Sequence, residues 1–264
     1  MRILIALVIS YGLFSCSTFT QTHHNKISHS EFQFSPSETS MQAIDNKLAQ
    51  AKLAQQKLLI VLGANWCHDS QGLIQRFSSN EMSSLLEKNY QTLFVDIGYY
   101  QKGYDVVSRF GMPIYYGTPT VMIIDPMSNK ITNLTSMQKW LNADSIDLQG
   151  YLDYFAREAK VNMPANTENS EQMLAYEQEI SAFSLHHAKR LKKAYEVLGP
   201  ALQRFIEQQV AFTEQEEQLW SQARRLRYNI QNDIIALRKQ ASHAASNGKS
   251  VQLNFPEYEA FAWE

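Results

Sequence analysis

The sequence predicts an α/β domain followed by an all-α region. Three short, almost wholly apolar runs are typical of buried strands, and they cover residues 57–64, 92–97 and 120–125. Segments with helical spacing surround these runs, at 41–56, 68–77, 81–89, 104–110 and 145–160. Strands that alternate with helices indicate a sheet with parallel members and helices on its faces. Beyond about residue 170, the apolar pattern is helical only.

A polar segment at 161–170 separates the two parts, and we expect a linker between domains there. The first domain then covers residues 41–160. The second part, 171–264, is predicted to be a helical hairpin or bundle with an aromatic C-terminal tail that packs back on the protein.

The helical region has its own start and stop signals. Gly199-Pro200 predicts the end of one helix and the start of another, because glycine suits the end of a helix and proline its first turn. Thr213 with Glu216 predicts a capping box at a third start. The last helix carries a narrow apolar stripe of Leu219, Ala223, Leu226, Ile230 and Leu237. This stripe favours helix-on-helix packing, either in a bundle or as a coiled coil across a homodimer.

The N-terminus has the layout of a secretory signal. Residues 1–15 place one basic residue before an apolar stretch too short to span a bilayer permanently. Leu13-Phe14-Ser15-Cys16 resembles a bacterial lipoprotein box, which implies cleavage and lipidation at Cys16. A cleaved signal with an incidental cysteine is the alternative. Residues 16–40 are polar and without period, so we expect a flexible tether that leaves the protein anchored by lipid in a bacterial envelope, facing the periplasm.

The composition excludes several classes of function. With 26 acidic and 24 basic side chains the formal net charge is −2, and 44% of the residues are apolar, as in an ordinary globular protein rather than a nucleic-acid binder. The two cysteines exclude a disulfide framework and the four-cysteine zinc sites. We expect no metal and no bound cofactor.

One turn carries the chemistry that the sequence suggests. Trp66-Cys67-His68-Asp69-Ser70 follows the first buried run and opens a helix, and Gly117-Thr118-Pro119-Thr120 leads into the third run. Together these segments resemble the thioredoxin superfamily, in which a Trp-Cys-x-x-Cys turn faces a cis-proline loop. The resemblance covers residues 41–160 and implies a thioredoxin-like sheet flanked by helices. It also implies a catalytic Cys67 and a substrate-binding surface at Trp66, Thr118 and Pro119.

The sequence departs from that family at one decisive position, because Ser70 stands where the second cysteine is expected. Once Cys16 is lipidated or removed, Cys67 is the only thiol, and no internal disulfide can form. A helix N-terminus stabilises a thiolate, to which His68 and Ser70 could contribute a charge and a hydrogen bond. The expected chemistry is monothiol exchange with cysteine-containing envelope proteins, with glutathione or another external thiol as co-substrate.

Several alternatives stay open. Cys67 could be an inert thiol in a non-catalytic binding or assembly protein, and His68 and Ser70 could be ordinary first-turn residues. The pair His186-His187 is predicted to lie on the surface. The basic side chains of Arg224, Arg225, Arg227 and Lys239 are expected to form a solvated face.

Overall fold

The computed structural model describes residues 32–35, 41–161 and 171–264. A four-stranded sheet lies at the centre of the N-terminal part, in the order β2-β1-β3-β4. β1 pairs with β2 in parallel and with β3 antiparallel, and β3 pairs antiparallel with β4. The strands are β1 (Lys57–Gly63), β2 (Tyr90–Asp96), β3 (Thr120–Asp125) and β4 (Lys130–Ile131).

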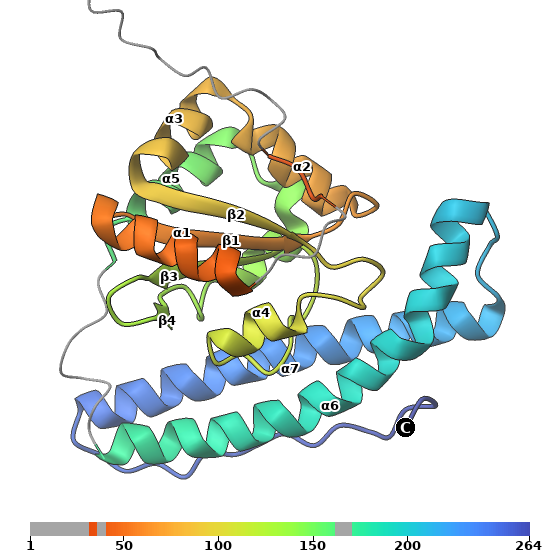
Figure 1. The fold of residues 1–264 in the computed structure, drawn as a ribbon. Coiled ribbons are helices and arrows are strands. Elements are labelled where there is room, and N and C mark those ends of the chain that lie inside the picture. The colour runs from red at the N-terminus through yellow and green to blue at the C-terminus, as the bar shows by residue number, and fades with distance from the viewer. Residues whose placement is uncertain (1–31, 36–40, 162–170) are drawn as a thin grey trace, which may run out of the picture.

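Helices cover both faces of this sheet (Figure 1). The N-terminal part contains α1 (Met41–Ala54), α2 (His68–Phe77), α3 (Asn80–Asn89), α4 (Tyr104–Arg109), the 3-10 helix η1 (Met137–Ser145) and α5 (Leu148–Glu158). The strands and helices predicted for this part of the chain are therefore confirmed. β4 and η1 were not predicted, because their short segments carry no clear apolar period. The predicted class, a thioredoxin-like α/β sheet flanked by helices, is confirmed.

The alternation of side chains along β1 divides the core in two. Leu58, Ile60 and Leu62 point to one cluster, with side chains of α1, α4 and the helical region. Leu59 and Val61 point to the other cluster, which α2, α3 and α5 cover. Because both faces of β1 are apolar, the strand reads as an unbroken hydrophobic run in the sequence.

The C-terminal part is a hairpin of two long helices, α6 (Glu171–Gln208) and α7 (Glu214–Ser246). The two helices pack side by side and run beneath the sheet domain, on the side of α4 (Figure 1). The predicted capping box is present, since the Thr213 hydroxyl accepts from the Glu216 amide and the Glu216 carboxylate accepts from the Thr213 amide. The aromatic tail packs on the protein as predicted, with Trp263 Nε1 donating to the Arg190 carbonyl at 3.1 Å.

The prediction that Gly199-Pro200 divides two helices is wrong. α6 continues through both residues to Gln208, with Pro200 inside it. A Cβ at Gly199 would lie 2.5 Å from the Tyr99 carbonyl oxygen, so glycine is present because α6 passes close to the chain that follows β2. A proline inside a helix removes one backbone hydrogen bond and bends the axis, and α6 changes direction in its second half (Figure 1).

Part of the predicted tether is also corrected. Phe32 and Phe34 are buried, and their rings contact Phe94 with centroids 5.8 and 5.3 Å apart. Burial of the two aromatic rings in the core stabilises the contact of this short segment with the sheet domain. The rest of the tether falls outside the described residues, together with the predicted signal, Cys16 and most of the 161–170 linker. Within the described ranges, no helix is long and apolar enough to cross a membrane.

Candidate active site at Cys67

Cys67 lies in the turn between β1 and α2, immediately before the first residue of the helix. Its backbone is extended, with φ −87° and ψ 120°, and the Gln71 amide donates to its carbonyl at 3.0 Å as the first turn begins. The thiol therefore lies at the positive end of the α2 dipole, where a thiolate is stabilised. The predicted position of the cysteine at a helix N-terminus is what the structure shows.

The loop that precedes β3 faces this cysteine. The Thr118–Pro119 peptide bond is cis, and both residues are buried. Cys67 Sγ donates to the Thr118 carbonyl oxygen at 3.3 Å. The structure thus brings Cys67, Thr118 and Pro119 together, as the resemblance implied. The carbonyl acceptor stabilises the protonated thiol, whereas the helix N-terminus stabilises the thiolate.

Ser70 lies one turn along α2, beneath the cysteine, and is fully buried. Its hydroxyl shares a hydrogen bond of 3.0 Å with the Thr118 hydroxyl and accepts from the Ala64 amide at 3.4 Å. The serine therefore connects the end of β1 to the cis-proline loop. A hydroxyl in this position can orient its neighbours but cannot attack a disulfide.

The structure places His68 away from the buried part of the site. Its side chain is 83% exposed, and Nε2 lies 3.5 Å from an Asp144 carboxylate oxygen. The neighbouring Asp69 accepts a hydrogen bond from the Asp144 amide at 3.1 Å and so ties α2 to η1. The imidazole of His68 thus lies at the protein surface, next to Asp144.

Trp66 forms one wall of the site. Its indole Nε1 donates to the Gly98 carbonyl at 2.8 Å, and its ring stacks on Tyr99 with a centroid separation of 6.3 Å. Tyr100 also approaches the indole edge-on, at 5.4 Å. Because a hydrogen bond and two tyrosine rings hold Trp66, its predicted role as a substrate-contacting residue rests on a fixed ring position. Only 8% of the Cys67 surface remains exposed.

The helical region also reaches the site, which the sequence did not predict. Tyr100 stacks on Tyr195 of α6 at 4.3 Å and accepts a hydrogen bond from Arg227 Nη1 of α7 at 3.2 Å. A Cβ on Gly117, beside Thr118, would lie 3.7 Å from the Arg227 guanidinium carbon. The prediction of Arg227 on a solvated face is therefore wrong, because the side chain turns inward from the edge of the apolar stripe.

Burial and charge shape the electrostatics around this contact. Burial raises the pKa of Tyr100, the Arg227 cation lowers it, and a negative charge on Cys67 raises it again. Burial lowers the pKa of Arg227, but the combined interactions with Tyr100 and Tyr195 outweigh burial and raise it above the usual value. Arg227 is thus a partly buried cation close to the loop that faces the thiol. The only hint of it in the sequence is its position next to Leu226 of the stripe.

His187 is a second correction, since it was predicted to lie on the surface. Only 5% of it is exposed, and its ring packs against Phe183 and Tyr258. It lies under the aromatic tail, and it does not contact Cys67. The described part of the chain contains no group of three or more His, Cys, Asp or Glu side chains that could hold a metal ion.

Comparison with known proteins gives a family match over part of the chain. Residues 39–126 match a family model described as thioredoxin-like, and this stretch includes the Cys67 turn and the cis-Pro119 loop. A search of curated proteins found no match. Among solved structures, a disulphide isomerase from Xylella fastidiosa Temecula1 is 25% identical, with a TM-score of 0.43. That alignment covers 47% of this chain and 96% of the other.

Proposed function

We propose that this chain, which carries a thioredoxin-like domain, performs monothiol disulfide exchange through Cys67. The observation that carries the proposal is the position of Cys67 at the N-terminus of α2, opposite Thr118 and cis-Pro119, with Ser70 in place of a second cysteine. This arrangement supplies a thiolate-stabilising helix end and a loop against which a client chain can lie. It supplies no thiol that could close an internal disulfide beside Cys67.

The exchange begins when the Cys67 thiolate attacks one sulfur of a client disulfide. A Cys67–client disulfide forms, and the other client sulfur leaves as a thiolate. In isomerisation, a different client thiolate attacks the client sulfur of this adduct and releases Cys67. In reduction, a thiolate such as that of glutathione attacks Cys67 Sγ and releases the second client thiolate. A further glutathione thiolate then attacks the bound glutathione sulfur, which yields oxidised glutathione and free Cys67.

Ser70 and Arg227 would act on this reaction without taking part in bond exchange. The Ser70 hydroxyl shares a hydrogen bond with the Thr118 hydroxyl and so fixes the loop that faces the cysteine. Arg227 would place a positive charge near the same loop, beside Gly117.

The direct test is mass spectrometry after incubation with oxidised glutathione. The mature protein, in which Cys16 is lipidated or removed, should gain one glutathione adduct, and its Cys67→Ala variant should gain none. The Ser70→Ala variant serves as a matched control that keeps the thiol, and it should still form the adduct. If the wild type forms no adduct under conditions that modify a free cysteine peptide, exchange at Cys67 is excluded.

One observation favours a second candidate, a non-catalytic binding or assembly protein. Cys67 is nearly covered, its thiol is hydrogen-bonded, and the helical hairpin packs against the neighbouring Tyr100. In such a protein the thioredoxin-like domain would present a surface rather than a nucleophile. The absence of a glutathione adduct, together with client binding that survives Cys67→Ala, would favour this candidate.

We also propose an envelope location, with the protein held to a membrane by lipid on Cys16. The support is the sequence of residues 1–16. Cysteine-containing envelope proteins would then be the clients, because disulfides form and persist outside the cytosol.

A further inference from the structure

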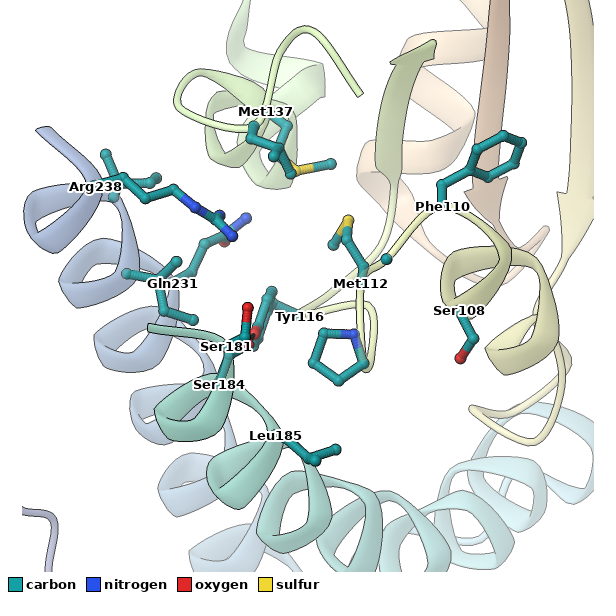
Figure 2. Close-up of a pocket in the computed structure, with 15 residues that line it drawn as sticks. Ser108, Phe110, Met112, Tyr116, Met137, Ser181, Ser184, Leu185, Gln231 and Arg238 are labelled. Carbon is teal, nitrogen blue, oxygen red and sulfur yellow. Dashed lines mark hydrogen bonds between the residues drawn. The ribbon is translucent and has the colours of Figure 1, made fainter. Parts of the chain in front are cut away.

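A cavity of about 310 Å³ lies where the sheet domain meets the helical hairpin. It is bounded by the chain between Ser108 and Tyr116, by Leu134 and Met137, and by one side each of α6 and α7 (Figure 2). Its volume is at the lower end of the range of small-molecule sites, roughly 300–1,000 Å³. None of the residues that form the Cys67 turn lines it. The cavity is therefore separate from the candidate active site.

Most of the lining is apolar. Phe110, Met112 and Met137 are buried, and the buried Ile234 of α7 also lines the cavity. In Figure 2 the two methionine side chains lie on one side of the cavity, between Phe110 and the polar residues of α7. Methionine sulfur makes favourable contacts with aromatic rings, and its flexible side chain adapts to the shape of a ligand. This wall therefore suits an aromatic ring.

The polar side chains at the other end of the cavity differ in whether they have hydrogen-bond partners. The Tyr116 and Ser184 hydroxyls share a hydrogen bond of 2.9 Å. Arg238 donates to the Glu177 carboxylate at 3.3 Å, so its charge is already neutralised. A ligand at this end need not carry a negative charge to satisfy the arginine.

Gln231 is the exception. It is only 7% exposed, it lines the cavity, and its Oε1 has no hydrogen-bond partner among the described residues. A buried acceptor without a donor costs about 1–3 kcal/mol. A ligand that donates a hydrogen bond to Gln231 Oε1 removes this cost and therefore binds more tightly. The terminal torsion of a glutamine side chain is soft, and the amide can turn its oxygen toward a ligand without any movement of α7.

We propose that this cavity binds a neutral phenol. The ring lies against Met112 and Met137, and the hydroxyl donates to Gln231 Oε1. The site is independent of Cys67 and goes beyond disulfide exchange. A phenol can belong to a small free molecule or to a tyrosine side chain of a polypeptide, and both present the same ring and donor to the cavity.

The test compares two ligands that differ in the donor alone, 4-propylphenol and its methyl ether 4-propylanisole. Binding is followed through the methyl NMR signals of Met112 and Met137 in the full-length protein, with Met82 in the opposite core cluster as the internal control. The phenol should shift both cavity methyls and leave Met82 unchanged, with an affinity about tenfold higher than that of the ether. Equal affinities for the two ligands, or no shift at Met112 and Met137, would overturn the proposal.

Two glutamine variants locate the hydrogen bond. Gln231→Leu should remove the preference for the phenol over the ether. Gln222→Leu is the matched control, because Gln222 lies on the same helix, also has a buried Oε1 without a partner among the described residues, and does not line the cavity. That variant should keep the tenfold preference. A Gln231→Leu protein that still prefers the phenol would show that the hydroxyl is bound elsewhere.

A third ligand distinguishes the two sources of the phenol. N-acetyltyrosinamide carries the phenol between two peptide groups, whereas 4-propylphenol has an alkyl chain in their place. Tighter binding of the tyrosine derivative assigns the site to a polypeptide, and tighter binding of propylphenol assigns it to a free small molecule. If neither shifts the cavity methyls, the assignment of a phenol is wrong.

Discussion

Arg227 of α7 donates a hydrogen bond to the Tyr100 hydroxyl at 3.2 Å, across 127 residues of sequence. Tyr100 in turn lies against Trp66, the residue before the candidate nucleophile. The helical hairpin is therefore attached to the wall of the Cys67 site. This contact makes the hairpin part of the site's environment, and it can be tested directly.

We expect Arg227→Leu to slow the reaction of Cys67. The substitution removes a positive charge near the cis-proline loop that faces the thiol, so alkylation by iodoacetamide at neutral pH should be roughly threefold slower. The Tyr100 hydroxyl also loses its donor, which should lower the free energy of unfolding by about 1–2 kcal/mol. Arg224→Leu removes an exposed arginine from the same helix and should leave both quantities unchanged. Equal alkylation rates in the two variants would contradict an electrostatic role for Arg227.

Ser70→Cys should convert the site to dithiol chemistry. Ser70 lies one turn from Cys67 at the start of α2, so a second thiol there can attack a Cys67 adduct. We expect the variant to gain reductase activity in an insulin turbidity assay, where the wild type shows little. Ser78→Cys also adds a thiol, but at the far end of α2, and it should gain nothing. An inactive Ser70→Cys protein that is folded by circular dichroism would count against a working thiol site.

Protonation of His187 should make the protein less stable in mild acid. Its pKa is lowered to about 4, first by burial and then by the nearby His186 and Arg190 cations, with Glu264 opposing them. The folded state therefore binds the proton less tightly than the unfolded chain, whose histidine titrates near pH 6.5. The stability that neutral His187 provides is complete above about pH 6.5 and is lost as the pH falls toward 4.

The measurement is urea unfolding at pH 7 and at pH 5. The wild type should lose about 2 kcal/mol more between these pH values than His187→Phe, which keeps the ring packing but cannot be protonated. His186→Phe replaces the exposed neighbour and should behave like the wild type. Because the ring of His187 contacts Tyr258, we expect the C-terminal tail to detach first in acid. A His187→Phe protein as acid-sensitive as the wild type would refute the assignment.

Gly199→Ala should destabilise the protein, although alanine is the better helix former. Propensity alone would stabilise an exposed helix by about 1 kcal/mol. Here the new methyl group would meet the Tyr99 carbonyl oxygen at 2.5 Å, which forces α6 away from the sheet domain. We expect a net loss of about 2 kcal/mol in urea unfolding. Val197→Ala, at a half-exposed position on the same helix, should change stability by less than about 0.5 kcal/mol.

Cys16→Ser should prevent lipid attachment. Metabolic labelling with a palmitate analogue should label the wild type and leave the variant unlabelled, as a precursor or a released protein. Cys67→Ser is the control, because it removes the other cysteine and should label normally. Equal labelling of wild type and Cys16→Ser would remove the lipid-anchor proposal.

The sequence predicted what depends on local pattern. The apolar run 57–64 indicated β1 because a strand buried on both faces has no polar positions. The Trp66-Cys67 turn and Pro119 were identified by the resemblance, and the structure places them together. In each case, the prediction depended only on residues that are close together in the sequence.

Features that depend on packing between distant segments were not predicted. Gly199 followed by Pro200 is typical of a helix end, and only the approach of Tyr99 shows why this glycine lies inside α6. Arg227 resembles its exposed neighbours in the sequence, and its contact with Tyr100 requires the tertiary fold. The roles of the 16–40 tether and the 161–170 linker stay predictions, except that Phe32 and Phe34 are ordered by the core.

The stack of Tyr100 on Tyr195 has a consequence for biosynthesis. At roughly 5–20 residues per second, the ribosome needs several seconds to produce the helical hairpin after the sheet domain has been completed. During that time the face that carries Tyr100 and Tyr115 has no cover, and the surroundings of Cys67 are incomplete. The environment of the thiol is therefore complete only when the last third of the protein has folded.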